Sequence, residues 1–115
     1  FWEFPGGKIE SGETPAQCAA RELREEMDIH IESGDLLTET THDYGNGKVV
    51  HLIAVRAILL GGHVRLHDHD DIRWVTVNEM GDYLFAPADE AIVERLELEH
   101  AFTKQARRHA GGDEA

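Results

Sequence analysis

Apolar residues recur at helical spacing between positions 15 and 27. They are three or four residues apart, so they share one face of an α-helix. Thr14 is a typical N-cap, Pro15 suits the first helical position, and Gln17 completes a capping box. The pattern therefore predicts a helix that ends near Met27. Its buried stripe consists of Ala16, Ala20, Leu23 and Met27.

Segments rich in apolar and β-branched residues predict two strands around a tight turn. One expected strand covers residues 36–44, and the run "VVHLIAVRAIL" from Val49 predicts a second, central strand. The Asn-Gly pair inside "YGNGK" supplies the positive φ angles of a hairpin turn. The glycines at residues 33–34 and 61–62 predict that the strands are interrupted there, with a turn at residues 61–62.

The remaining segments predict shorter elements and a second helix. Residues 1–5 look extended, and "HVRL" and "IRWVTV" (residues 72–77) read as short strands separated by an acidic loop. Asn78 is expected to cap a short turn. Ala88 to Glu99 reads as an amphipathic helix.

These elements predict a single α/β domain over residues 1–103, followed by a polar tail over residues 104–115. A chain of 115 residues is long enough for one small domain with a modest core. The first residue is Phe1, and "FWEFPGG" reads like the middle of a chain, so we expect an N-terminal truncation.

Charge and cysteine content narrow the class of protein. The formal net charge of −12 disfavours nucleic acid polymers, which usually bind basic patches, but it permits a small phosphorylated ligand if cations bridge the two. No apolar run is long enough to cross a bilayer. Cys18 is the single cysteine, so we expect a packed thiol and a reducing, cytoplasmic location.

Three carboxylates crowd together near the end of the first predicted helix. Glu22 is three and four positions from Glu25 and Glu26, so the helix brings all three side chains together. At about 6 Å and an effective dielectric constant near 20, each pair repels by about 3 kcal/mol before salt screening. Either the cluster is a solvated face with an Arg21–Glu25 ion pair, or it holds a divalent cation such as Mg²⁺.

The same glutamates belong to a longer pattern of fixed spacing. In order along the chain, it consists of Gly7, Glu13, Arg21-Glu22-Leu23, Glu25-Glu26 and Ile29. This pattern resembles the Nudix box, which has the same residue types at the same spacing. Asp28 departs from it, because the box has glycine there. Aspartate tolerates left-handed backbone better than most residues, so we expect a modest loss of stability rather than loss of function.

The resemblance extends over about residues 1–98 and includes "WEFPGGKIESGETP", which is similar to the MutT-like subgroup. It implies an α/β/α sandwich with a mixed β-sheet between two helices. The subgroup has an opening β-hairpin before the position of Trp2, which this sequence lacks. It also implies a metal-dependent hydrolase, using Mg²⁺ or Mn²⁺, that cleaves nucleoside triphosphates to monophosphate and pyrophosphate.

The resemblance also implies roles for individual residues. Glu22, Glu25 and Glu26 match the metal-binding glutamates, and the Gly6 carbonyl matches a backbone ligand. Catalysis would use Glu25, Glu26, Arg21 and Asp68. Glu13 and Arg21 match the residues that orient the carboxylates, and Lys8 matches a phosphate contact.

Asp68 is the expected catalytic base or additional metal ligand, because it lies six residues before Trp74, where the subgroup has a glutamate. Asp70 or Asp71 is an alternative, and a solvated acidic turn is another. The histidines in this loop raise the possibility of a zinc site, which the absence of a nearby cysteine disfavours.

Asp89 matches the position from which the subgroup reads the base, and Phe4 or Trp2 would stack on that base. Ionised aspartate only accepts hydrogen bonds, which favours the amino group of cytosine over 8-oxo-guanine. The alternatives are an N-cap role for Asp89, an 8-oxo-dGTP diphosphatase, and a catalytically silent Nudix domain that binds a nucleotide or a protein. We expect a small-molecule nucleoside triphosphate as partner, no nucleic acid polymer or membrane, and a monomer or dimer.

Overall fold

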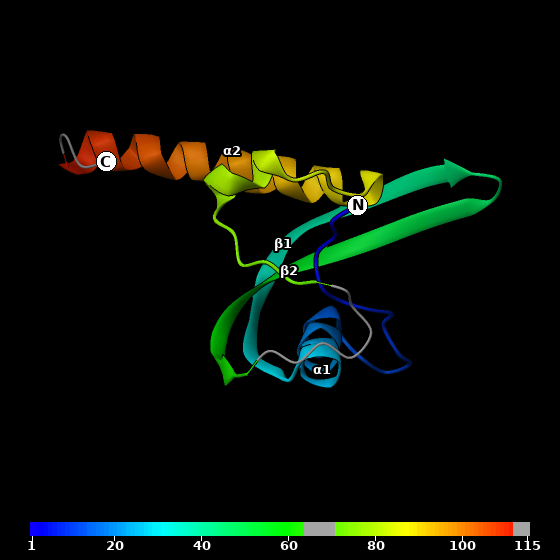
Figure 1. Ribbon diagram of the computed structural model, residues 1–115. Helices are drawn as coiled ribbons and strands as arrows, with labels where there is room; N and C mark the ends of the chain where they lie inside the picture. The colour runs from blue at the N-terminus through cyan, green and yellow to red at the C-terminus, as the bar shows by residue number, and fades with distance from the viewer. Residues whose placement is uncertain (64–70, 112–115) are drawn as a thin grey trace.

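The computed structural model describes residues 1–63 and 71–111 of the chain. A long β-hairpin lies between two helices, as Figure 1 shows, with α1 beside its base and α2 on the other side. The elements in chain order are α1 (Pro15–Met27), β1 (Ile29–Gly45), β2 (Lys48–Gly62), η1 (Val77–Asp82) and α2 (Pro87–Gly111). This arrangement confirms the predicted α/β class with a helix on each side of the strands.

Helix α1 begins and ends where the sequence predicts. The Thr14 hydroxyl accepts a hydrogen bond from the Gln17 N–H at 3.1 Å, and the Gln17 side chain accepts one from the Thr14 N–H at 2.9 Å. Asp28 ends the helix in the left-handed conformation, with φ of 55°, and its N–H donates to the Arg24 carbonyl at 3.1 Å. Aspartate therefore adopts the backbone conformation that the missing glycine would supply.

The hairpin is longer than the sequence predicts. β1 begins at Ile29 rather than at residue 36, because residues 33–34 do not interrupt pairing but are absorbed as an irregularity in the register. The Ser33 hydroxyl donates to the Ala16 carbonyl at 2.7 Å, which fastens this part of β1 to α1. At the turn, Asn46 and Gly47 have φ of 54° and 80°, as the Asn-Gly pair predicted.

Three predictions for the second half of the chain were wrong. Residues 72–76 form no strand, because no described segment pairs with them. Thr76, not Asn78, is the N-cap of η1, and its N–H and hydroxyl both donate to the Glu79 carboxylate. Helix α2 continues to Gly111 rather than ending near Glu99, since no glycine or proline interrupts it.

Residues 1–4 run parallel to residues 83–86 and link the N-terminal segment to the start of α2. The Trp2 N–H donates to the Leu84 carbonyl, and the Ala86 N–H donates to the Trp2 carbonyl, each at 2.8 Å. The paired strands β1 and β2 are antiparallel, and the Trp2–Phe85 bridge is an isolated parallel bridge outside that pair, so the described residues form an antiparallel sheet and not the expected mixed one. Within the same residues, no helix is both long and apolar enough to cross a membrane.

The buried apolar side chains come from every layer of the structure except β2 and include Cys18, whose burial confirms the expected packed thiol. Both helices, β1 and η1 contribute to this small core. Its members are Cys18, Met27, Ile29, Met80, Ala88 and Ile92.

Candidate active site

Helix α1 presents the predicted glutamates on the side away from its apolar stripe. The Glu22 side chain is 14% exposed, whereas that of Glu25 is 53% exposed. Glu26 is half-buried on the same helix. The capped start of α1 and its defined end at Asp28 fix the rotation of the helix, so the sequence spacing places these side chains directly.

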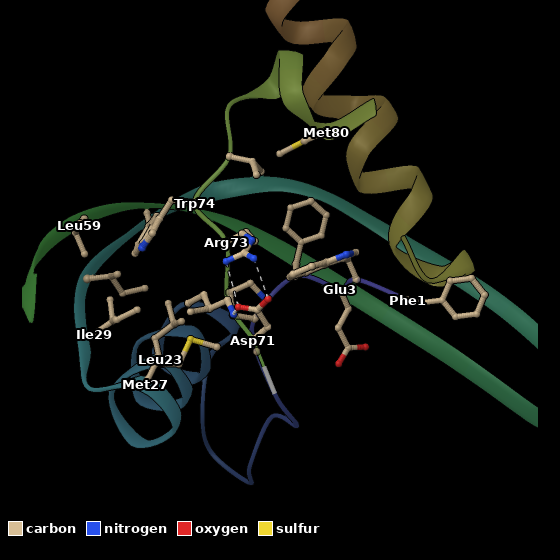
Figure 2. A pocket seen from close by; sticks show the side chains of 18 residues that line it. Phe1, Glu3, Leu23, Met27, Ile29, Leu59, Asp71, Arg73, Trp74 and Met80 are labelled. Atoms are coloured by element: carbon tan, nitrogen blue, oxygen red, sulfur yellow. Dashed lines mark hydrogen bonds and ion pairs between the residues drawn. The ribbon is translucent and has the colours of Figure 1, made fainter. Parts of the chain in front are cut away.

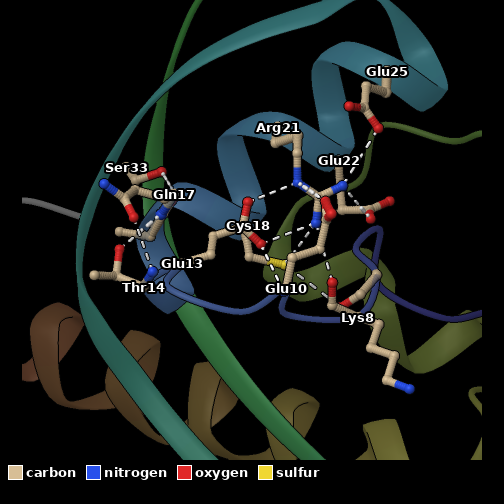
Figure 3. A network of polar contacts seen from close by, with 12 residues as sticks. Lys8, Glu10, Glu13, Thr14, Gln17, Cys18, Arg21, Glu22, Glu25 and Ser33 are labelled. Atoms are coloured by element: carbon tan, nitrogen blue, oxygen red, sulfur yellow. Dashed lines mark hydrogen bonds and ion pairs between the residues drawn. The ribbon is translucent and has the colours of Figure 1, made fainter.

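The Arg21 guanidinium joins α1 to the loop that precedes it, as Figure 3 shows. Its Nε and Nη2 atoms donate to the two carboxylate oxygens of Glu13, at 2.7 and 3.0 Å. Nη2 also donates to the Lys8 carbonyl at 3.1 Å, and Nε lies 3.0 Å from a Glu10 carboxylate oxygen. A bidentate pair of this kind fixes the orientation of both groups, so the loop is held against the helix.

This contact shifts the ionisation of both partners. The hydrogen bonds from the Arg21 side chain, followed by the Glu10 N–H, lower the pKa of Glu13 to about 2. The Glu13 hydrogen bond in turn raises the pKa of Arg21 above its ordinary value. Both groups therefore stay ionised over the whole physiological range.

The same guanidinium also reaches the predicted metal-binding glutamates. Arg21 Nη1 donates to Glu22 Oε1 at 2.8 Å and to Glu25 Oε2 at 3.3 Å. The Arg21–Glu25 ion pair, which the sequence analysis gave as part of the solvated-face alternative, is therefore present. Because one nitrogen is within reach of both carboxylates, Arg21 offsets part of the repulsion between them.

Gly7 brings the loop backbone onto the Glu22 side chain. A Cβ atom built on Gly7 would overlap the Glu22 carboxylate, so any other residue here would force that carboxylate to turn aside. The Cys18 thiol faces the Gly7 carbonyl at 3.6 Å and helps to place it. The backbone at Gly7 and Lys8 therefore lies directly against the acidic face of α1.

The donor set fits a divalent cation, although the described residues do not form a ready-made ligand group. Among the side chains described, those of residues 1–63 and 71–101, no group of three acidic, histidine or cysteine side chains has the geometry to hold a metal ion. Arg21 Nη1 is itself a cationic group placed between Glu22 and Glu25. Carboxylate and carbonyl oxygens at that place have the chemistry that Mg²⁺ prefers.

The other predicted site residues differ in how they lie relative to this cluster. Gly6, the residue before Gly7, is exposed. The ammonium group of Lys8 extends away from Arg21 in Figure 3. Asp68 and Asp70 lie outside the described residues. The alternative base, Asp71, is paired with Arg73 at 3.3 Å.

Glu10 is a member of the cluster that the sequence analysis did not single out. The Glu13 N–H donates to the Glu10 carbonyl, and the Glu10 N–H donates to the Glu13 carboxylate, each at 3.0 Å. Gly12, with φ of 79°, makes this reversal possible. The turn-forming pair Ser11-Gly12 lies between the two glutamates, and it is the sequence signal that could have predicted that Glu10 and Glu13 come together.

Asp89 and Phe4, the predicted base-binding pair, are joined directly to each other. The Phe4 N–H donates to Asp89 Oδ1 at 3.0 Å, and the Phe4 ring stacks on Phe85 at a centroid distance of 5.3 Å. Asp89 lies in the first turn of α2 with 6% exposure, and its carboxylate bonds to Phe4 rather than capping the helix. Burial raises the pKa of the Asp89 carboxyl, with the Phe4 N–H acting in the opposite direction.

A cavity of about 570 Å³ includes Gly6 in its lining, and Figure 2 shows side chains from the N-terminal segment, α1 and β2 around it. Its walls are mostly apolar, and the Asp71–Arg73 ion pair is part of the lining. The apolar lining includes Trp2, Phe4, Leu23, Met27, Ile29, Leu59 and Trp74. Asp89 is not in this lining, whereas Phe4 and Trp2, the residues expected to stack on the base, are.

Comparison with known proteins identifies the pattern. The NUDIX domain family matches residues 1–96. The chain belongs to the Nudix family. It is 34% identical over 94 residues to the CTP pyrophosphohydrolase of Escherichia coli (strain K12). The aligned residues cover 82% of this Nudix chain and 69% of the relative. It is 30% identical over 94 residues to the 8-oxo-dGTP diphosphatase of Haemophilus influenzae, covering 82% and 68% of the two chains.

The fold comparison agrees with the sequence comparison. The crystal structure of the MutT protein from Methanosarcina mazei Go1 superimposes with a TM-score of 0.73 at 26% identity, covering 86% of this Nudix chain and 72% of that protein. Nudix membership makes the protein a hydrolase that acts on acid anhydrides. Nudix hydrolases generally use divalent metals and act on small-molecule nucleotides.

Proposed function

We propose that this protein is a Mg²⁺- or Mn²⁺-dependent pyrophosphohydrolase that converts nucleoside triphosphates and water to nucleoside monophosphates and pyrophosphate. Its role would be sanitation of the nucleotide pool in the cytoplasm. The observation that carries the proposal is the convergence of Glu22 and Glu25 on one cationic nitrogen of Arg21. Two carboxylates that share one cationic nitrogen lie close enough to share a divalent cation, which supports a cation site between the helix and a triphosphate.

In this proposal, Glu22, Glu25 and Glu26 hold the cation, with the Gly6 carbonyl as a further ligand. A bound divalent cation would neutralise phosphate charge and lower the pKa of a coordinated water. The bidentate contact of Arg21 with Glu13 leaves Nη1 to orient the Glu22 and Glu25 carboxylates.

The triphosphate and the attacking water need two further groups. The Lys8 ammonium, exposed beside the cluster, would contact a phosphate oxygen. Asp68 would accept the proton from the attacking water, or act as another metal ligand.

A cytidine-type substrate is the preferred choice within this class. The Asp89 carboxylate accepts hydrogen bonds, and an acceptor suits the N4 amino group of cytosine. One of its oxygens is engaged by the Phe4 N–H, which leaves the other for a base. The Escherichia coli relative is named for CTP, which supports this choice, while the Haemophilus influenzae relative supports 8-oxo-dGTP as the second candidate.

The test is a pyrophosphate-release screen of the purified protein against ordinary and oxidised (d)NTPs with Mg²⁺. We expect turnover of CTP or dCTP, loss of turnover by at least about 100-fold in Glu26→Gln, and an unchanged melting temperature. Glu97→Gln, an exposed glutamate on α2, is the matched control and should behave as wild type. Wild-type turnover by Glu26→Gln would overturn the catalytic assignment. Nucleotide binding without turnover by the wild type would favour a silent binding domain.

A further inference from the structure

We propose that Asp89 is a positioning residue for the metal site, because its hydrogen bond to the Phe4 N–H fixes where the Gly6-Gly7 backbone meets Glu22. This inference rests on the proposed function, since it assigns a role toward the same cation site. It concerns a contact between the first turn of α2 and the backbone of the N-terminal segment, separate from any contact that Asp89 makes with a base.

The anchor is a buried contact between distant parts of the chain. Asp89 is the single charged side chain that is buried among residues 1–63 and 71–101, and Oδ1 accepts from the Phe4 N–H at 3.0 Å. A buried carboxylate without a hydrogen bond is costly, so this bond strongly favours one position of Phe4. The stacking of Phe4 on Phe85 supports the same position.

The anchored segment leads directly to the acidic face of α1. Gly7 is three residues after Phe4, and three residues span at most about 10 Å. At Gly7, the backbone lies so close to the Glu22 carboxylate that a Cβ would overlap it, so a shift of this backbone changes its distance from that carboxylate. A displacement of Phe4 is therefore transmitted to the Gly6 and Gly7 backbone instead of being absorbed by slack chain.

The other contacts of the N-terminal segment form two groups, one before Phe4 and one after it. Before Phe4, the Trp2 backbone pairs with Leu84 and Ala86. After Phe4, the Gly7 and Lys8 carbonyls face Cys18 and Arg21 on α1. Between these two groups, the Phe4 N–H donates to Asp89 at the point where the chain leaves residues 83–86.

Three variants separate this role from a general effect on stability. Asp89→Ala removes the acceptor, whereas Asp89→Asn keeps an oxygen that can accept from Phe4. Tyr44→Phe is the matched control, because the Tyr44 hydroxyl accepts from the Ala88 N–H at 3.1 Å on the same turn of α2 but does not contact the N-terminal segment.

The experiment uses the protein without nucleotide and has two readouts. Amide hydrogen exchange of the metal-free protein reports on residues 4–8, and electron paramagnetic resonance reports the affinity for Mn²⁺. We expect Asp89→Ala to speed exchange at residues 4–8 and to weaken Mn²⁺ binding by about tenfold, the low end of the range for residues that orient metal ligands. Asp89→Asn and Tyr44→Phe should stay within about twofold of wild type in both readouts.

Each other outcome has a defined meaning. Wild-type Mn²⁺ affinity in Asp89→Ala overturns the inference, as does an equal loss in Tyr44→Phe, which would indicate general destabilisation. An equal loss in Asp89→Asn would also overturn it, because the charge rather than the hydrogen bond would then matter. Failure of the wild type to bind Mn²⁺ overturns the proposed function itself. If Asp89→Ala does not fold, Asp89→Ser, whose side chain is too short to reach Phe4, takes its place.

Discussion

Gly7 lies so close to Glu22 that a side chain at this position would displace the Glu22 carboxylate. A Cβ on Gly7 would overlap the Glu22 carboxylate, yet Gly7 does not have a positive φ that would itself require glycine. The need for glycine at this place therefore comes from the neighbouring carboxylate and not from the backbone.

The variant Gly7→Ala tests this relationship. The methyl group would push the Glu22 carboxylate away, and we expect the Mg²⁺ or Mn²⁺ affinity to fall by about tenfold or more, with turnover falling in parallel. Because Glu22 is a flexible side chain that can turn aside, the melting temperature should change little. Titration calorimetry with Mn²⁺ and thermal unfolding measure the two effects.

Gly81→Ala is the control for this variant. A Cβ on Gly81 meets no atom within 4 Å, and its φ is not positive. Metal affinity should therefore equal that of the wild type. Equal metal binding by Gly7→Ala and wild type would show that the Glu22 carboxylate is not a ligand in the position described.

The Glu13–Arg21 contact predicts a specific acid sensitivity. Because the pKa of Glu13 is lowered from 4.5 to about 2 in the folded protein, its contribution to stability is present above pH 4.5 and is lost as the pH falls toward 2. Glu13→Gln lacks this contribution, so we expect it to be less stable than wild type at neutral pH and to lose less stability on acidification. Urea unfolding at several pH values between about 2 and 7 measures the difference, and parallel curves would contradict the prediction.

Asp28 predicts a stabilising substitution. Its φ of 55° is unfavourable for a residue with a side chain but free of strain for glycine. We expect Asp28→Gly to stabilise the protein by about 1 kcal/mol, which is about 4 °C in melting temperature for a domain of this size. Asp28→Ala should destabilise it, since alanine keeps the Cβ atom. A lower melting temperature for Asp28→Gly would mean that the aspartate side chain contributes more than the backbone strain costs.

The raised pKa of Asp89 predicts a dependence of stability on pH that is opposite to the one predicted for Glu13. A carboxyl whose pKa is higher in the folded than in the unfolded state stabilises the fold below 3.8, and this contribution is lost as the pH rises through the folded pKa. Asp89→Asn stays neutral and can still accept from Phe4. It should therefore melt at a higher temperature than wild type at about pH 7.5 and at a similar temperature near pH 3, by differential scanning calorimetry. A difference that does not vary with pH would contradict this explanation.

Sequence reasoning predicted best where local rules act alone. Thr14, Pro15 and Gln17 fix the start of α1 through contacts within three residues, and glutamate spacing then places Glu22 and Glu25. The Asn-Gly turn was equally local.

What sequence reasoning missed depends on distant contacts. The partner of the Asp89 carboxylate is a backbone N–H 85 positions earlier, which no pattern of side chains reveals. Residues 72–76 have strand-forming composition, but a strand also needs a pairing segment, and composition cannot show whether one is present. The roles of Asp68 and Lys8 stay predictions.

The C-terminal end of β2 has a consequence for how the protein behaves in solution. Ile58, Leu59 and Leu60 are 62%, 54% and 66% exposed, and Leu59 is part of the lining of the apolar cavity. A strand of this kind can pair with the same strand of another molecule, and the charge of −12 opposes the encounter. Concentrated salt or a pH near the isoelectric point of 4.9 weakens that repulsion, so clustering of molecules should increase under both conditions.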